Sequence, residues 1–147
     1  MTGFLQSQDH EMLVEFAHIM TGSCLGSGMS RTVYVHPDDN TKIIKFEKLG
    51  YFQNANEWQF WREWKDNKNV SKYLAPCHRI SYNGRMLVMD RAFDIRPDEL
   101  PKMLPAWITD HDISNFGKIG NRIVCRDYGY TRQRLDLVMR KWKDRNL

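Results

Sequence analysis

Residues 110–129, DHDISNFGKIGNRIVCRDYG, place oxygen-bearing side chains at both ends of a short strand-like run. Asp110 and Asn115 precede the run, and Asp127 follows it in an Asp-Tyr-Gly sequence. Carboxylate and amide oxygens are the ligands that Mg²⁺ prefers in proteins. A further carboxylate beside such a site can orient a hydroxyl and accept its proton. The alternative interpretation is turn chemistry on a solvated hairpin.

A carboxylate also falls on the apolar side of residues 53–66, QNANEWQFWREWKD. Glu57, Phe60 and Trp64 occupy helical positions i, i+3 and i+7, so Glu57 shares a face with the aromatic rings. Burying it without a partner costs on the order of several kcal/mol, so it needs a cation. Lys45, in the predicted strand TKIIKFE, is the nearest candidate in sequence. The alternative is an exposed Glu57 at the rim of the helix.

The sequence LGSGMSR contains Gly26, Ser27, Gly28 and Ser30 just before a predicted strand. Glycines at such a position let backbone N–H groups approach a phosphate closely. A turn alone would also explain a single GxG.

The elements that must position these residues follow from periodicity and turn chemistry. Two amphipathic helices are predicted, over 9–20 and 53–66, and a third over the basic tail, where Leu135, Val138, Met139 and Trp142 form a stripe. Strands are predicted at RTVYVH and TKIIKFE around the turn PDDN, and at CHRISY and RMLVMDRA around Asn83-Gly84, a type I′ turn signal. The proline-rich residues 93–105 form a connector or a short helix. The order indicates an α+β fold with antiparallel sheets.

The last predicted hairpin has a specific register. If Gly120-Asn121 is the centre of its turn, residue 119 faces 122, 117 faces 124 and 115 faces 126. Asn115 and Asp127 then lie at the same open end of the hairpin.

In chain order these motifs resemble the protein-kinase signature set. LGSGMSRTVY is similar to the glycine-rich loop, IIK to the strand that ends in the phosphate-binding lysine, and LVMDRA to the strand that leads to the hinge. DHDISN resembles the catalytic loop, and DYG resembles the metal-binding Asp-Phe-Gly motif. The similarity covers roughly residues 22–130 and is greatest to small kinase-like proteins of bacteria and tailed phages.

The resemblance implies ATP and Mg²⁺ as ligands and gives each residue a role. Asp110 is the expected base, and Lys45, aligned by Glu57, holds the phosphates. Asn115 and Asp127 are the expected metal ligands, whereas Asp112 matches no motif position. The nucleotide is expected to contact the glycine loop at Gly26, Ser27, Gly28 and Ser30, and the hinge at Met89–Ala92, including Arg91.

The resemblance also implies two lobes. Residues 1–92 form the expected N-terminal lobe, an antiparallel sheet with a helix corresponding to helix C. Residues 93–147 form a strongly reduced C-terminal lobe with a connector, the catalytic loop, the metal-binding hairpin and the terminal basic helix. Ile108-Thr109 replace the usual His-Arg, and no Ala-Pro-Glu or helical platform for a peptide follows. Apolar surface around Trp107 and Trp142 then suggests a partner or self-association as a homo-oligomer.

Composition narrows the protein class. No apolar run reaches 18 residues, which excludes a membrane-spanning helix, and the N-terminus lacks the pattern of a signal peptide. Three isolated cysteines fit a reducing, cytoplasmic environment (that of the bacterial host, if a phage encodes the chain) and argue against structural zinc. The formal charge of +4 resides in residues 131–147. A solvated helix face explains that charge better than nucleic-acid binding.

Two functions from different classes are the main hypotheses. The first is an ATP- and Mg²⁺-dependent phosphotransferase, a minimal protein kinase that modifies a protein hydroxyl. The second is a kinase-derived module, catalytically weak or inactive, that binds and inhibits or redirects a host macromolecule. Nucleic-acid binding through the tail is a third and weaker hypothesis.

Overall fold

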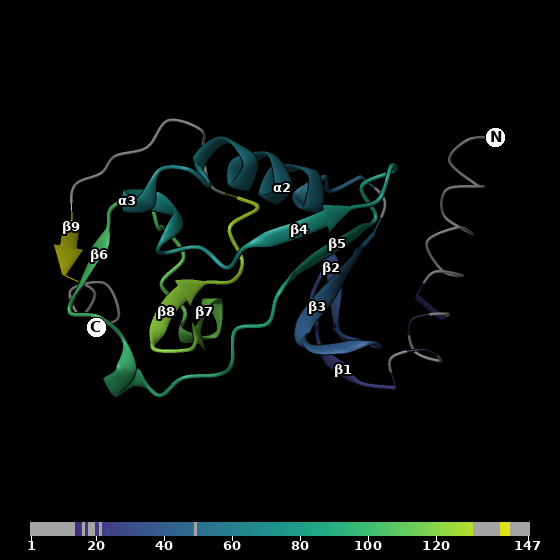
Figure 1. Cartoon of the computed structure of the whole chain (residues 1–147), viewed down its shortest axis with the longest axis horizontal. Coiled ribbons are helices and arrows are strands. Elements are labelled where there is room, and N and C mark those ends of the chain that lie inside the picture. The colour runs from purple at the N-terminus through teal and green to yellow at the C-terminus, as the bar shows by residue number, and fades with distance from the viewer. Residues whose placement is uncertain are drawn as a thin grey trace.

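The structure, a computed structural model, describes residues 14, 15, 17, 20, 22–48, 50–130 and 139–141. Its architecture is mixed α+β, as predicted (Figure 1). The first half of the chain contains β1 (Cys24–Ser27), β2 (Arg31–His36), β3 (Asp39–Glu47), α2 (Gln53–Trp64), α3 (Lys68–Ser71), β4 (Cys77–Ile80) and β5 (Met86–Asp90). The remainder contains 3₁₀ turns at Pro97–Glu99 and Ile113–Asn115, with β6 (Met103–Pro105), β7 (Phe116–Ile119), β8 (Arg122–Cys125) and β9 (Met139–Lys141).

The five strands of the first half form one antiparallel sheet in the order β1-β2-β3-β5-β4. Side chains of β3 alternate between its two faces, as strand geometry requires. Ile44 and Phe46 pack with Tyr34 on one face, while Ile43 belongs to the main core on the other. Lys45 therefore points toward α2 and away from Ile44 and Phe46, as predicted.

The hairpin predicted around Asn83-Gly84 is present between β4 and β5, but its turn type is different. Only Gly84 has a positive φ, of 76°, whereas a type I′ turn needs two such residues. The Gly84 amide donates to the Ser81 carbonyl at 2.9 Å, and Asn83 Oδ1 accepts from the Arg85 amide at 3.0 Å. The Asn83 side chain bonds to the backbone locally, and this stabilises a wider turn that needs one left-handed residue.

Helix α2 lies along the sheet (Figure 1) and presents a buried face that contains Glu57 and Phe60. Trp61 and Trp64 are half-buried beside that face. The residue before the helix, Phe52, has a left-handed φ of 58° and is exposed.

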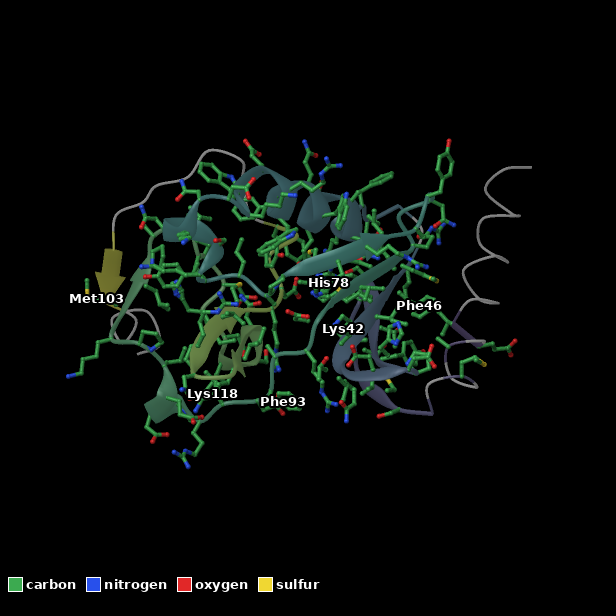
Figure 2. All side chains as sticks on the ribbon, viewed as in Figure 1. Lys42, Phe46, His78, Phe93, Met103 and Lys118 are labelled. Atoms are coloured by element: carbon green, nitrogen blue, oxygen red, sulfur yellow. The ribbon has the colours of Figure 1, made fainter. Side chains whose placement is uncertain are left out.

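The second half of the chain is small but shares the core of the first. Trp107, Phe116 and Val124 belong to the same buried cluster as Ile43 and Leu87. The segment after β5 is joined to the β7–β8 hairpin by a bridge between Phe93 and Lys118, which lie close together in Figure 2. The two predicted lobes therefore have one continuous core.

The predicted helix over the basic tail is wrong at residues 139–141. These form β9, which pairs antiparallel with β6, so Met103 is opposite Lys141 and Pro105 is opposite Met139. The exposed edge of β6 offers backbone partners, and pairing with it overrides the helical spacing of the apolar residues. The other tail residues, including Leu135, Val138 and Trp142, lie outside the described part of the chain.

The predicted helix over 9–20 also falls largely outside the described residues. The four that the structure describes there, at 14, 15, 17 and 20, are helical, and Ala17 is buried near Tyr34 and Phe46. Within the described part of the chain, no helix has the length and apolar character needed to cross a membrane.

Candidate active site

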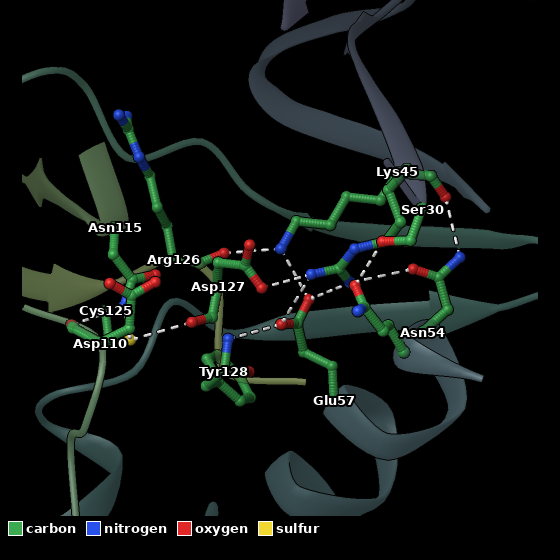
Figure 3. A network of polar contacts seen from close by, with 12 residues as sticks. Ser30, Lys45, Asn54, Glu57, Asp110, Asn115, Cys125, Arg126, Asp127 and Tyr128 are labelled. Atoms are coloured by element: carbon green, nitrogen blue, oxygen red, sulfur yellow. Dashed lines mark hydrogen bonds and ion pairs between the residues drawn. The ribbon is translucent and has the colours of Figure 1, made fainter. Parts of the chain in front are cut away.

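Glu57 is fully buried and makes the ion pair with Lys45 that its position on α2 predicts (Figure 3). The Lys45 Nζ lies 2.6 Å from Glu57 Oε1 and donates a second hydrogen bond to the Arg126 carbonyl, also at 2.6 Å. An exposed Glu57 at the rim of the helix is therefore excluded. Burial alone would raise the pKa of Glu57, but the charges of Arg31 and Lys45 outweigh it and lower the pKa to about 2.

Arg31 is a second cation in this network, and sequence reasoning missed it. Its guanidinium donates to Glu57 Oε1 at 2.9 Å and to Asn54 Oδ1 at 3.2 Å, and it also pairs with Asp127. Its position follows from the β2–β3 register, which the structure shows and in which Val33 is opposite Lys45. Strand alternation therefore places Arg31, two residues before Val33, on the face of the sheet that carries Lys45.

Asp127 begins the Asp-Tyr-Gly segment that follows β8, and its carboxylate is partly exposed beside Arg31. The next residue fixes the segment to α2, because the Tyr128 amide donates to Glu57 Oε2 at 2.7 Å (Figure 3). The Tyr128 hydroxyl donates to the Ala75 carbonyl at 2.8 Å, and its ring is buried against Phe60. Asp127 is thus held between a charged network and a packed aromatic side chain.

Gly129 is required here by close packing. A Cβ at this position would lie 2.8 Å from the carbonyl oxygen of Gln53, the first residue of α2. Ser30, at the end of the glycine loop, contacts the same residue through a 2.7 Å hydrogen bond from its Oγ to Gln53 Oε1. The start of α2 therefore touches both the glycine loop and the segment that carries Asp127.

The hairpin has the predicted register, with Ile119 opposite Arg122 and Gly117 opposite Val124. Beyond the strands, the Arg126 amide donates to the Asn115 carbonyl at 2.9 Å, which extends the pairing to the open end. Figure 3 draws Asn115, Cys125 and Asp127 in one view at this end of the hairpin. The Cys125 thiol connects the other two, because its Sγ lies 3.3 Å from Asn115 Nδ2 and 3.4 Å from the Asp127 carbonyl.

Asn115 is buried and has one oxygen without a partner. Its Nδ2 donates to the Asp110 carbonyl at 3.1 Å, while among the described residues none donates to its Oδ1. The Asp110 carboxylate is exposed and accepts from the Asp112 amide at 3.1 Å. Asp112 itself caps the 3₁₀ turn by accepting from the Ser114 amide at 2.9 Å. Asp112 therefore has a structural role in the loop that holds Asp110 and Asn115.

A cleft of about 620 Å³ opens between the glycine loop and the Asp127 segment. It is lined by most of the predicted ligand-contacting residues, namely Gly26, Ser27, Gly28, Ser30, Lys45, Arg91 and Asp127. Its apolar wall includes Val33, Ile43, Ala92 and Phe93. Asp110 and Asn115 are near the Asp127 segment but are not part of the lining.

Met89, the other predicted hinge contact, does not line the cleft. It is fully buried within the sheet, opposite Ile43 on one side and Cys77 on the other. The strand continues for one more residue, and the chain leaves the sheet only at Arg91, whose amide donates to the Thr41 carbonyl at 2.7 Å. The wall of the cleft after β5 therefore begins two residues later than the sequence predicted.

The glycines of the loop are not explained by backbone conformation. Neither Gly26 nor Gly28 has a positive φ, and a Cβ on Gly26 would meet no atom within 4 Å. Turn geometry, the alternative raised by the sequence, therefore does not require them. Their lack of side chains leaves backbone exposed at the mouth of the cleft.

The donor set for a metal ion is small. Over the described residues, no three His, Cys, Asp or Glu side chains gather in a way that could hold a metal. The oxygens at hand are Asn115 Oδ1, which lacks a donor, and the Asp127 carboxylate, which has one oxygen on Arg31. Amide and carboxylate oxygens of this kind are the ligand type that Mg²⁺ prefers.

A scan against models of known protein families finds no match to this chain, and a search of the curated proteins finds none either. The kinase resemblance of the motifs therefore stays a prediction. A function must be inferred from the geometry of the cleft itself.

Proposed function

We propose that this chain is an ATP-dependent phosphotransferase with a reduced kinase-like fold, and that its acceptor is a hydroxyl on a protein. The observation that carries the proposal is the buried Lys45–Glu57 pair at 2.6 Å, with Lys45 in the wall of a cleft beneath a glycine-rich loop. A buried ion pair is weak evidence for stability alone. A lysine held in the wall of a cleft by a buried carboxylate suits the binding of phosphate.

The cleft supports a ligand with an apolar part and an anionic part. Val33, Ile43 and Ala92 offer an apolar surface of the kind that receives a base. Lys45 and the open backbone at Gly26 and Gly28 lie where phosphates would be held. Nucleotides combine these two properties.

Asp110 is the residue that we assign to the acceptor. In phosphoryl transfer the acceptor oxygen forms a bond to the γ-phosphorus, and the bond from that phosphorus to the β,γ-bridging oxygen breaks. Asp110 would orient the acceptor hydroxyl and take its proton. Its carboxylate is exposed and lies outside the cleft lining, so the acceptor must approach from outside. This favours a hydroxyl on a macromolecule.

Asn115 Oδ1 and Asp127 are the groups that would hold Mg²⁺, because one is a buried oxygen without a donor and the other is a partly exposed carboxylate. A bound divalent cation would supply charge neutralisation at the transferring phosphoryl group. Arg31 and Lys45 keep the neighbouring carboxylates in place independently of a metal.

The decisive experiment is transfer of label from γ-labelled ATP, with Mg²⁺ or Mn²⁺, to the chain itself and to proteins of a bacterial lysate. We expect transfer by the wild type and its loss in Asp110→Asn. Asp112→Asn is the matched control, because it lies two residues away, is exposed, and asparagine retains the capping oxygen. Equal loss in both variants, or no transfer by the wild type, would contradict the proposal.

One observation favours the second function, a kinase-derived module that binds a host macromolecule without transfer. Arg31 already occupies one oxygen of Asp127, the carboxylate on which metal binding depends. A partner protein whose binding persists in Asp110→Asn and Lys45→Met, together with no label transfer, would establish that function.

A further inference from the structure

Arg31 stands out because it is a buried cation at a position where the proposed reaction needs no arginine. It is 6% exposed, yet it lines the cleft, and three acceptors hold it: Asn54, Glu57 and Asp127. Its two terminal nitrogens make all of these contacts. The Nε–H is the remaining guanidinium donor, and no described residue accepts from it.

The cleft carries excess positive charge before any metal is added. Its lining has four cationic side chains and two carboxylates, namely Arg31, Lys45, Arg91 and Arg126 against Asp94 and Asp127. The buried Glu57 beneath the lining reduces the balance to one positive charge. An anionic ligand would therefore be attracted by the protein alone.

Arg31 and Lys45 are linked through Glu57, which accepts from both at 2.9 and 2.6 Å. Their positions are fixed by β2 and β3, adjacent strands of one sheet. A planar guanidinium suits phosphate oxygens, because it presents several N–H donors in a fixed geometry. Held in this way, Arg31 is already oriented to bind a phosphate. A phosphate oxygen would replace the Asp127 carboxylate as one of its acceptors.

We propose that Arg31 supplies the positive charge against which a nucleotide polyphosphate rests, so that nucleotide binding in this cleft, unlike phosphoryl transfer, requires no divalent cation. The inference rests on the proposed function, since it takes the ligand of the cleft to be a nucleotide. It assigns binding to Arg31 and Lys45, and leaves Asn115 and Asp127 Oδ2 to a metal that is needed for transfer.

The experiment is calorimetric titration of the full chain with ATP, once in EDTA and once with Mg²⁺. For the wild type we expect the two dissociation constants to agree within about tenfold, because hydrogen bonds to charged groups supply the binding in both cases. Arg31→Met should weaken binding in EDTA by about tenfold or more, the value of one charged hydrogen bond. Arg79→Met, which removes an exposed charge on β4 outside the cleft, should leave both constants unchanged.

Arg31→Met leaves Glu57 with one cation fewer, so its folding is checked by circular dichroism. Asp127→Asn provides a second variant that does not touch Glu57. It frees Arg31 from a carboxylate, so ATP binding in EDTA should be retained or become tighter, whereas loss of binding would contradict the inference. Wild-type binding that needs Mg²⁺ would overturn the role of Arg31 but leave the proposed function standing. No binding under either condition would overturn the proposed function itself.

Discussion

Replacing Glu57 by glutamine tests the charged network directly. The carboxylate is fully buried and accepts from Lys45 at 2.6 Å, from Arg31 at 2.9 Å and from the Tyr128 amide at 2.7 Å. Glutamine keeps the shape but removes the charge and places an NH₂ group among donors. Breaking a buried pair by removing one partner costs about 3–5 kcal/mol, because the remaining charge is left uncompensated.

The pKa of Glu57 gives an independent magnitude. Burial raises it, but Arg31 and Lys45 lower it further, from 4.5 to about 2. At about 1.4 kcal/mol per pKa unit, the ionised carboxylate contributes about 3 kcal/mol to stability. Because the folded-state pKa is the lower one, this contribution is fully present above pH 4.5 and is lost as the pH falls toward 2. Both estimates therefore place the cost of Glu57→Gln near 3 kcal/mol at pH 7.

Urea unfolding followed by tryptophan fluorescence measures this cost. The matched control is Glu63→Gln, an exposed glutamate on the same helix, for which we expect a change within about 0.5 kcal/mol. The difference in the free energy of unfolding between the wild type and Glu57→Gln should become smaller as the pH falls from 5 to 3. The reason is that the wild type then loses the contribution of the ionised carboxylate, which the variant already lacks. Equal effects of the two substitutions on stability at pH 7 would refute the reasoning, and so would a difference between the wild type and Glu57→Gln that increases in acid.

Three further predictions concern the packing around the site. In the native protein Cys24 alone should react with a thiol reagent at pH 8, because Cys77 and Cys125 are buried and burial raises the pKa of each thiol to about 12. Mass spectrometry before and after unfolding in urea counts the modified thiols. Gly129→Ala should lower stability by about 1–3 kcal/mol in urea, since its Cβ would meet backbone at 2.8 Å, whereas the control Gly26→Ala meets no atom and should fold normally. Tyr128→Phe should cost about 1 kcal/mol in thermal unfolding because a buried carbonyl loses its donor, and an unchanged midpoint would contradict this.

Local rules predicted β2 to β5 and the last hairpin, but not β1, because Cys24–Ser27 were expected to belong to a glycine-rich loop. Strand alternation placed Lys45 on the face toward α2, helical spacing placed Glu57 on the buried side, and the Gly120 turn fixed the last hairpin register. In each case a single residue period or turn determines the direction of a side chain. The burial of a carboxylate then requires a cation, so Lys45 and Glu57 could be paired from the sequence alone.

The errors arose where a tertiary contact competes with a local pattern. Met139 belongs to an apolar helical stripe, but it forms a strand because the edge of β6 offers backbone partners. The cleft wall after β5 begins at Arg91, two residues after the predicted Met89, because Asp90 still pairs with Lys42. The periodicity of one segment identifies neither the strand with which it will pair nor the residue at which that pairing stops.

Arg31 was not predicted because its position depends on the register between β2 and β3. It also determines how the elements around the cleft are held together. Through Glu57 and Asp127 it joins the glycine loop, α2 and the segment after β8, while Glu57 also accepts from the Tyr128 amide. Moving α2 outward would therefore break several charged contacts at once, at a cost comparable to that of losing Glu57. The second half of the chain takes part in holding α2, because Asp127 and Tyr128 belong to it and contact Arg31 and Glu57. One buried network therefore fixes α2, the Asp127 segment and Lys45 together.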